Sequence, residues 1–213
     1  FFRPHTPFVA PKKYFDLYSK DDIVIPESSP DYLKTIPIPA AKSVRSKKNQ
    51  INLEKDLAKE IKQAYFATIS FVDAQVGRII NKLKQSGLDK NTIVVFTSDH
   101  GYHMGEHGHW QKQTLFNNAT KVPLIINVPG KDYISKISNS PVELIDIFPT
   151  LMDLTNIISP SHVVGESLKP IIENKSSDVR KSALTRWRNG YSIRTERFRL
   201  TKWDINGDFQ YEL

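Results

Sequence analysis

The chain has 213 residues, of which 39% are hydrophobic, with a formal net charge of +7 and a pI near 9.4. This length and composition allow one full hydrophobic core and argue against a disordered chain. Lysine and arginine are scattered, so we expect no nucleic-acid partner, and the charge is either a solvated surface or a match to an anionic substrate. The absence of cysteine excludes disulfides and thiolate metal sites, and no apolar run approaches the roughly eighteen residues of a membrane span.

The first half of the chain is predicted to hold loops followed by one long helix. Prolines recur through residues 1–50, which predicts an extended segment with a short helix only at residues 12–18. From about Asn52, apolar side chains recur every three or four positions up to Gly87. This period predicts a long amphipathic helix that a C-cap glycine closes.

Two short runs of β-branched and aliphatic residues follow, at residues 92–97 and 122–128. Continuous apolar runs of this kind are typical of parallel strands buried on both faces. Residues 142–154 carry a helical pattern, with a kink expected at Pro149. This order of elements predicts an α/β sheet covered by helices.

The texture changes after residue 175, where shorter alternating strands are predicted at residues 182–187, 191–195 and 198–203. Asn189-Gly190 is a hairpin-turn signal between the first two. Residues 209–213 have the pattern of a further strand that is still running, and the chain opens with no Met or signal peptide, so we expect both ends to be truncated.

The segment from Ser98 to Lys112 holds four of the six histidines of the chain, directly after a predicted strand. Ligand sites in α/β sheets lie at the carboxyl ends of strands. Asp99 offers carboxylate oxygens for a divalent cation, and His100 an imidazole for a metal or an anionic oxygen. Lys112 supplies a positive charge for an anion.

The order of residues in this region resembles the second signature of the sulfatase family. The matching strings are Thr97-Ser98-Asp99-His100-Gly101, Gly105-Glu106-His107-Gly108, Trp110, Lys112, Val122-Pro123-Leu124 and Val128-Pro129-Gly130. The opening Arg3-Pro4-His5-Thr6-Pro7-Phe8 resembles the Lys-Pro-His-x-Pro-Phe segment of iduronate 2-sulfatases, with Arg3 in place of Lys.

This resemblance implies an α/β fold of the alkaline-phosphatase type, a mostly parallel sheet flanked by helices and followed by a small antiparallel subdomain. Residues 1–175 would be part of the α/β domain, without its N-terminal portion, and residues 176–213 the start of the subdomain. The implied activity is hydrolysis of a sulfate ester on a small molecule or a glycan, such as an iduronate-type sulfate. The family acts in the periplasm, in lysosomes or outside the cell.

The resemblance also implies roles for four residues. Asp99 would ligate one calcium ion, and His100 would lie beside it, facing the sulfate or the metal. Lys112 would hold a sulfate oxygen, and His5 would lie near the leaving oxygen. The catalytic residues would thus be His5, His100 and Lys112, the substrate-binding residues Lys112 and His5, and the metal ligands Asp99 and His100. A cation, a lysine and an imidazole suit sulfate-ester cleavage, which needs charge neutralisation and a proton donor.

Two features of the family pattern are missing from this sequence. Sulfatases make a formylglycine nucleophile from a Cys/Ser-x-Pro-x-Arg motif, which does not occur here. An Asp-Asp pair that completes the calcium site is also missing, since Asp21-Asp22 follows no predicted strand and is interpreted as a loop pair. We therefore expect both in a missing N-terminal half of the domain, and expect the 213 residues alone to be inactive.

Several alternatives remain open from the sequence. His103, His107 and His109 could form a zinc cluster, although the intervening glycines argue against one helical face; otherwise His107 makes loop hydrogen bonds, and His103 and His109 face solvent or substrate. The tryptophans either pack in the core or stack on sugar rings. The alternative functions are a phosphatase or phosphodiesterase of the same superfamily and a glycan-binding protein without catalysis.

Overall fold

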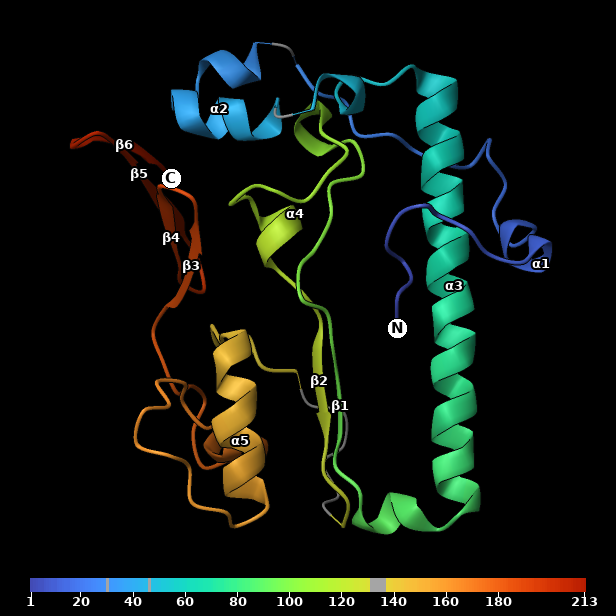
Figure 1. The fold of residues 1–213 in the computed structure, drawn as a ribbon, viewed down its shortest axis with the longest axis vertical. Helices are drawn as coiled ribbons and strands as arrows, with labels where there is room; N and C mark the ends of the chain where they lie inside the picture. The colour runs from blue at the N-terminus through green and yellow to red at the C-terminus, as the bar shows by residue number, and fades with distance from the viewer. Residues whose placement is uncertain (30, 46, 131–136) are drawn as a thin grey trace.

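One long helix, α3 (Lys55–Gln85), forms one side of the molecule over almost its full height (Figure 1). The computed structural model describes residues 1–29, 31–45, 47–130 and 137–213. The Glu54 carboxylate caps α3 by accepting hydrogen bonds from two backbone N–H groups of its first turn. Gly87 follows the last turn with a positive φ of 68°. The predicted helix and its closing glycine are therefore confirmed.

The segment before α3 is mostly loop, as its prolines predict, and packs on the helix through aromatic rings. Tyr14 lies 5.5 Å from Phe71, and Tyr18 lies 5.4 Å from Phe66, between ring centroids. The short helix expected at residues 12–18 forms as α1 (Lys12–Phe15).

A second helix in this segment, α2 (Ile38–Val44), contradicts the prediction that α1 would be the only one. Pro39 is the second residue of α2, where a backbone N–H has no acceptor within the helix. Proline therefore begins this helix instead of preventing it. Two short 3-10 turns flank it, η1 (Tyr32–Lys34) and η2 (Lys48–Gln50).

After η3 (Leu88–Asn91), β1 (Val94–Thr97) and β2 (Leu124–Asn127) form a two-stranded sheet. The strands run antiparallel, so the parallel pairing predicted for them is wrong. A parallel pair needs a crossover that returns the chain to the start of the first strand. Residues 98–123 instead stay at one end of the pair, where the Gly101 N–H donates to the Ala119 carbonyl oxygen at 2.8 Å. The segment contains η4 (Glu106–Gly108) and α4 (Asn117–Thr120).

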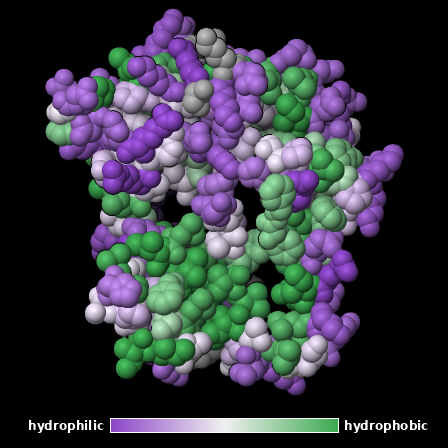
Figure 2. Space-filling model, viewed as in Figure 1, coloured by the Kyte–Doolittle hydropathy of each residue, from purple (hydrophilic) through white to green (hydrophobic). Residues whose placement is uncertain are grey.

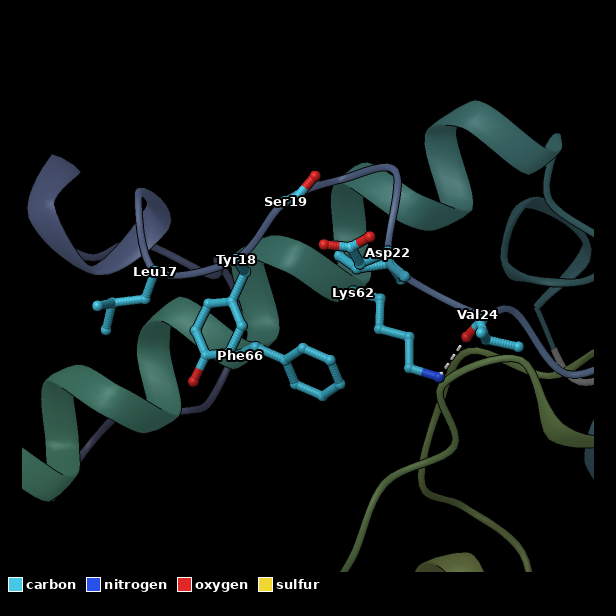
Figure 3. Close-up of a pocket in the computed structure, with 8 residues that line it drawn as sticks. Leu17, Tyr18, Ser19, Asp22, Val24, Lys62 and Phe66 are labelled. Carbon is cyan, nitrogen blue, oxygen red and sulfur yellow. Dashed lines mark hydrogen bonds between the residues drawn. The ribbon is translucent and has the colours of Figure 1, made fainter.

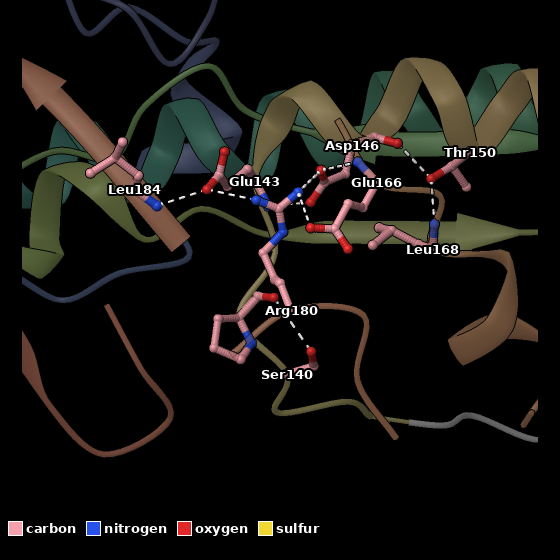
Figure 4. A network of polar contacts seen from close by, with 9 residues as sticks. Ser140, Glu143, Asp146, Thr150, Glu166, Leu168, Arg180 and Leu184 are labelled. Atoms are coloured by element: carbon pink, nitrogen blue, oxygen red, sulfur yellow. Dashed lines mark hydrogen bonds and ion pairs between the residues drawn. The ribbon is translucent and has the colours of Figure 1, made fainter. Parts of the chain in front are cut away.

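Residues 144–154 form η5 (Leu144–Asp146) and then α5 (Ile147–Leu154). The kink expected at Pro149 is absent from this described segment, because Pro149 lies in the first turn of α5, where its missing N–H breaks no helical hydrogen bond. The fully buried Asp146 accepts hydrogen bonds from the backbone N–H groups of Glu143 and Glu166 and pairs with Arg180 (Figure 4). This network ties the start of α5 to the chain that follows α6 (Lys169–Ile172).

The strands β1 and β2 are also less buried than predicted. Phe96 and Ile125 lie opposite each other and are 39% and 59% exposed. Figure 2 shows apolar side chains gathered over the lower half of this face, where β1, β2 and α5 lie in Figure 1. Among the described residues, this apolar surface therefore stays partly open to solvent at Phe96 and Ile125.

The predicted antiparallel sheet at the end of the chain is confirmed and has four strands, in the order β3-β4-β5-β6. Its first turn is Arg188-Asn189, one residue earlier than expected, because Trp187 pairs with Gly190. The strands are β3 (Ala183–Trp187), β4 (Gly190–Arg194), β5 (Arg199–Ile205) and β6 (Asp208–Glu212).

A buried cluster joins this sheet to α2 and to the loop before α4. Its members are Leu33, Ala40, Val44, Leu115, Phe116 and Trp203. A second cluster, Ala58, Met104 and Trp110, joins α3 to the loop after β1. Trp110 and Trp203 thus serve packing, one of the two uses left open. The chain has the predicted α/β class, and none of the helices described is both long and apolar enough to cross a bilayer.

Candidate functional site

The candidate site begins where β1 ends, at Ser98, Asp99 and His100. The Ser98 hydroxyl donates to the His100 carbonyl oxygen at 2.9 Å, and the His100 N–H donates to Asp99 Oδ1 at 3.1 Å. A Cβ atom on Gly101 would lie 2.1 Å from the Asn118 carbonyl oxygen, so only glycine fits there. This close backbone approach fixes the loop, and the Asp99 side chain remains 84% exposed.

Asp99 and His100 form an adjacent pair of ligand groups. Nε2 of His100 lies 3.5 Å from Asp99 Oδ2, and Nδ1 lies 2.8 Å from the Gly101 carbonyl oxygen. Because a carbonyl oxygen only accepts, Nδ1 carries the proton, and Nε2 presents a lone pair when the ring is neutral. A lone pair and a carboxylate this close are best accommodated with a proton or a cation nearby.

The Asp99 carboxylate fits a calcium ion, and the His100 imidazole fits it less well. Calcium takes roughly six to eight oxygen ligands, and an imidazole nitrogen is not one of them. Within the described ranges, no group of three or more His, Asp or Glu side chains is arranged to hold a metal. Asp99 can therefore supply one ligand, while the chemistry of His100 suits a place beside the ion, next to an anionic oxygen.

Lys112 lies at the far end of the same loop, between two anchored neighbours. Before it, the Gln111 amide donates to the Gln50 side chain at 2.9 Å, and the Gln111 carbonyl accepts from the His103 N–H at 2.9 Å. After it, the Thr114 N–H donates to the Lys112 carbonyl oxygen at 2.8 Å. Among the residues that the structure describes, the Lys112 ammonium has no ion pair or hydrogen bond, so its charge is free for an anion.

His5 comes from the N-terminal segment, which the fold brings beside this loop. Phe8 packs edge-on against Tyr65 of α3 and Tyr102 of the loop, with ring centroids 5.3 and 5.9 Å apart. The His5 side chain is exposed, and its Nδ1 donates to the Thr6 carbonyl oxygen at 2.8 Å. No contact within the described chain joins His5 to Asp99, His100 or Lys112, so the fold brings together the segments and not yet these side chains.

His103 and His109 are fully buried, so the prediction that they face solvent or substrate is wrong. Their ring centroids lie 5.0 Å apart, and Nε2 of His103 lies 2.9 Å from the Thr114 hydroxyl. Burial, with a smaller contribution from neighbouring imidazoles, lowers the pKa of His103 to about 3 and that of His109 to about 4. Both rings are therefore neutral near pH 7 and belong to the core of the loop.

His107 stacks on Phe116 and Tyr32, with ring centroids 4.3 and 5.1 Å apart. Among the described residues its ring makes no hydrogen bond, so the loop hydrogen bonds expected of it are replaced by packing. Burial also lowers the pKa of His107. The three imidazoles His103, His107 and His109 form no metal-binding group in the described part of the chain.

Two hollows in the surface lie apart from these charges. The first, of about 380 Å³, lies between the chain after α1 and α3 and is lined partly by Tyr18, Asp22 and Lys62 (Figure 3). Lys62 there donates to the Val24 carbonyl oxygen at 2.9 Å. Asp21 and Asp22 are exposed loop residues, as predicted. The second hollow, of about 340 Å³, is lined by residues of the His5 segment, α3 and the loop, including Thr6, Leu57 and Tyr102.

Two residues that hold the loop, Gln50 and Arg199, belong to none of the motifs that predict the site. Gln50 lies 61 positions before Gln111, so their hydrogen bond has no local signal. Arg199 was detectable in principle, because it shares its strand face with the buried Thr201 and Trp203. A charged residue on an inward face indicates a buried ion pair.

Two family models match the chain. The model described as Sulfatase matches residues 1–157. The model described as N-sulphoglucosamine sulphohydrolase, C-terminal, matches residues 105–213. The two matches overlap across the loop that holds Lys112.

The chain is also similar to individual proteins. A Sulfatase from Formosa agariphila is 34% identical over 217 residues, which is 100% of this chain and 42% of that protein. Human Iduronate 2-sulfatase is 34% identical over 194 residues, 74% of this chain and 35% of that protein. The chain thus spans about two fifths of the length of these curated relatives. Among solved structures, the phosphonate monoester hydrolase SpPMH from Silicibacter pomeroyi matches with a TM-score of 0.86 and 25% identity, over 98% of this chain and 47% of that chain.

Proposed function

Since this chain belongs to the sulfatase family, with an α/β fold of the alkaline-phosphatase type, we propose that the protein hydrolyses sulfate monoesters carried by a glycan. One observation carries the proposal: a single loop after β1 presents an exposed carboxylate at Asp99 and an ammonium at Lys112 that has no partner among the residues the structure describes. A carboxylate that can bind a cation and an ammonium that can bind an anion, both on one loop, suit a metal-bound oxyanion.

Each proposed site residue has a chemical role that its geometry permits. A calcium ion, when bound, neutralises charge on the sulfate oxygens, and Asp99 contributes a carboxylate oxygen to it. Lys112 binds a sulfate oxygen as a point charge. His100 lies beside Asp99, where its Nε2, when the ring is doubly protonated, donates to a sulfate oxygen, and His5 as an imidazolium gives its Nε2 proton to the leaving oxygen.

The nucleophile and the remaining calcium ligands are proposed to come from outside residues 1–213. No Cys/Ser-x-Pro-x-Arg motif occurs in the chain, and a formylglycine needs one. We therefore propose that these residues alone do not turn over substrate. The exposed apolar face around Phe96 and Ile125 is proposed to pack against the same N-terminal half of the domain. A periplasmic, lysosomal or secreted location fits a glycan substrate.

The human relative is named for iduronate, a sugar acid, and the net charge of +7 favours a polyanionic substrate. This supports a sulfated polysaccharide over a small sulfate ester of a neutral alcohol. The likeness to a phosphonate monoester hydrolase favours a second candidate, hydrolysis of a phosphonate or phosphate ester at the same loop.

Kinetics of the full-length protein on paired aryl esters test the proposal. We expect turnover of an aryl sulfate to exceed that of the matching aryl phosphonate monoester, and Lys112→Ala to lower kcat/KM for the sulfate about 100-fold. Lys121→Ala is the matched control, since Lys121 is an exposed lysine near the end of the same segment between β1 and β2. Faster turnover of the phosphonate would establish the second candidate. A Lys112→Ala protein with the same kcat/KM for the sulfate as wild type would leave the loop without its proposed role.

A further inference from the structure

Arg199 of β5 extends its guanidinium group from the C-terminal sheet into the loop that carries Lys112. Its Nη1 atom lies 2.7 Å from Glu212 Oε1 of β6 and 3.3 Å from the Leu115 carbonyl oxygen, and it also donates to the Thr201 hydroxyl. The Arg199 and Glu212 side chains are only 14% and 6% exposed. One buried nitrogen atom thus contacts β5, β6 and the loop.

Because the ion pair is almost completely shielded from solvent, stabilisation of the fold alone is a poor explanation for it. Replacing a buried ion pair by well-packed apolar residues is often neutral or stabilising. An apolar side chain, however, could not donate to the Leu115 carbonyl oxygen. Glu212 is itself held, since Trp203 Nε1 lies 3.4 Å from its Oε2. The pair therefore has a directional function: it fixes the position of the Leu115 backbone.

A second contact joins Arg199 to the same loop. Its guanidinium carbon lies 5.1 Å from the centre of the Phe116 ring, and Phe116 stacks on His107 at 4.3 Å. Arg199 thus holds both the backbone at Leu115 and the side chain of the next residue.

Two hydrogen bonds connect the backbone next to Leu115 to Lys112. The Phe116 N–H donates to the Thr114 hydroxyl at 3.3 Å, and the Thr114 N–H donates to the Lys112 carbonyl oxygen at 2.8 Å. On its other side, Lys112 follows Gln111, which Gln50 anchors. Lys112 is therefore fixed on both sides, and the C-terminal sheet supplies one of the two anchors.

From these contacts we propose that Arg199 is a positioning residue that holds the Lys112 ammonium in place for the sulfate. The inference rests on the proposed sulfate-binding role of Lys112. Misplacement of a binding group by about 1 Å can cost on the order of 100-fold in rate. Arg199→Lys keeps a positive charge for Glu212 but loses the planar guanidinium that lies by the Phe116 ring while its Nη1 contacts the Leu115 carbonyl oxygen, so we expect an intermediate loss, about tenfold in kcat/KM.

A double-mutant cycle in the full-length protein tests the proposal. Arg199→Lys and Lys112→Ala are measured singly and together with an aryl sulfate. If Arg199 acts through Lys112, Arg199→Lys costs about tenfold when Lys112 is present and less than about twofold in the Lys112→Ala protein. Thermal melting and calcium affinity of Arg199→Lys should stay close to wild type.

Arg180→Lys is the matched control. Arg180 is 12% exposed and paired with Glu143 and the buried Asp146, and its contacts among the described residues lie around α5 and not in the Lys112 loop. Any loss of activity that it causes should be the same factor in both backgrounds.

Two results would overturn the inference. One is a loss from Arg199→Lys that is equally large with and without Lys112, or absent in both. The other is an Arg199→Lys protein that no longer folds under conditions where Arg180→Lys folds, since the pair would then serve the fold. A Lys112→Ala protein with full activity would instead refute the proposed function, and the inference with it.

Discussion

Leu115 and Gly190 pack so closely that a Cβ atom built on Gly190 would lie 2.6 Å from Leu115 Cδ1. The same atom would lie 2.7 Å from the Trp203 ring. Gly190 pairs with Trp203 across β4 and β5 and lies inside the strand, after the turn. Its lack of a side chain therefore serves the contact between the C-terminal sheet and the Lys112 loop, and not the hairpin turn that the sequence suggested.

Gly190→Ala should destabilise the full-length protein by about 1–3 kcal/mol, because Leu115 and the Trp203 ring must shift to admit the methyl group. Gly77→Ala is the control: a methyl group on Gly77, within α3, would meet no atom of its surroundings within 4 Å, so alanine should stabilise the helix by about 1 kcal/mol. Urea unfolding midpoints measure both changes. A Gly190→Ala protein as stable as wild type would show that the contact can relax at no cost.

The Arg180 network should contribute far more to stability than the exposed ion pair next to it. Arg180→Met leaves the fully buried Asp146 without its cation and should cost about 3–5 kcal/mol. Lys181→Met breaks the 3.0 Å pair with Asp178, in which the lysine is 88% exposed, and should cost about 0–1 kcal/mol. Denaturant unfolding of the two proteins provides the comparison, and equal losses would contradict it.

Where local chemistry decides structure, the sequence was a reliable guide. The 3.6-residue period predicted α3, and alternation predicted the C-terminal strands. The prediction failed at α2 because a proline was interpreted without its position in the helix, where the second residue needs no N–H acceptor.

What the sequence could not supply depends on the path of the chain. Antiparallel pairing of β1 and β2 follows from a loop that closes through Gly101 and Ala119. The burial of His103 and His109 follows from how the loop folds on itself, with His103 against His109 and Thr114, and from the bridge between His109 and Ile51. The motif predicts this loop as a site, but the anchor Gln50, which lies 61 positions before Gln111, follows only from the fold.

The buried His103 should make folding sensitive to acid. Its pKa of about 3 in the folded protein lies below the ordinary value of 6.5, so the unfolded chain binds the proton first as pH falls. The part of the stability that depends on His103 should thus decrease by about 1.4 kcal/mol per pH unit below about 6.5 and level off near pH 3. His103→Gln removes this titrating group. As pH falls from 6 to 4, the stability of the variant relative to wild type should therefore rise by that slope. A difference between the two proteins that stays constant over this range would contradict the prediction.

Asp99 and Lys112 should separate metal binding from substrate turnover in the full-length protein. Asp99 presents an exposed carboxylate at the end of β1, whereas Lys112 lies 13 positions further on, at the other end of a loop fixed by Gly101. Asp99→Ala removes an oxygen ligand and should weaken calcium binding at least about tenfold, and turnover with it. Lys112→Ala should leave calcium affinity unchanged and lower kcat/KM about 100-fold, because a lysine ammonium has no lone pair for a metal. Calorimetric calcium titration and aryl sulfate kinetics on both variants test this, with Lys121→Ala as the control. Normal calcium binding by Asp99→Ala, or zinc in the purified protein, would contradict the assignment of this loop to sulfate hydrolysis and favour the phosphonate or phosphate ester.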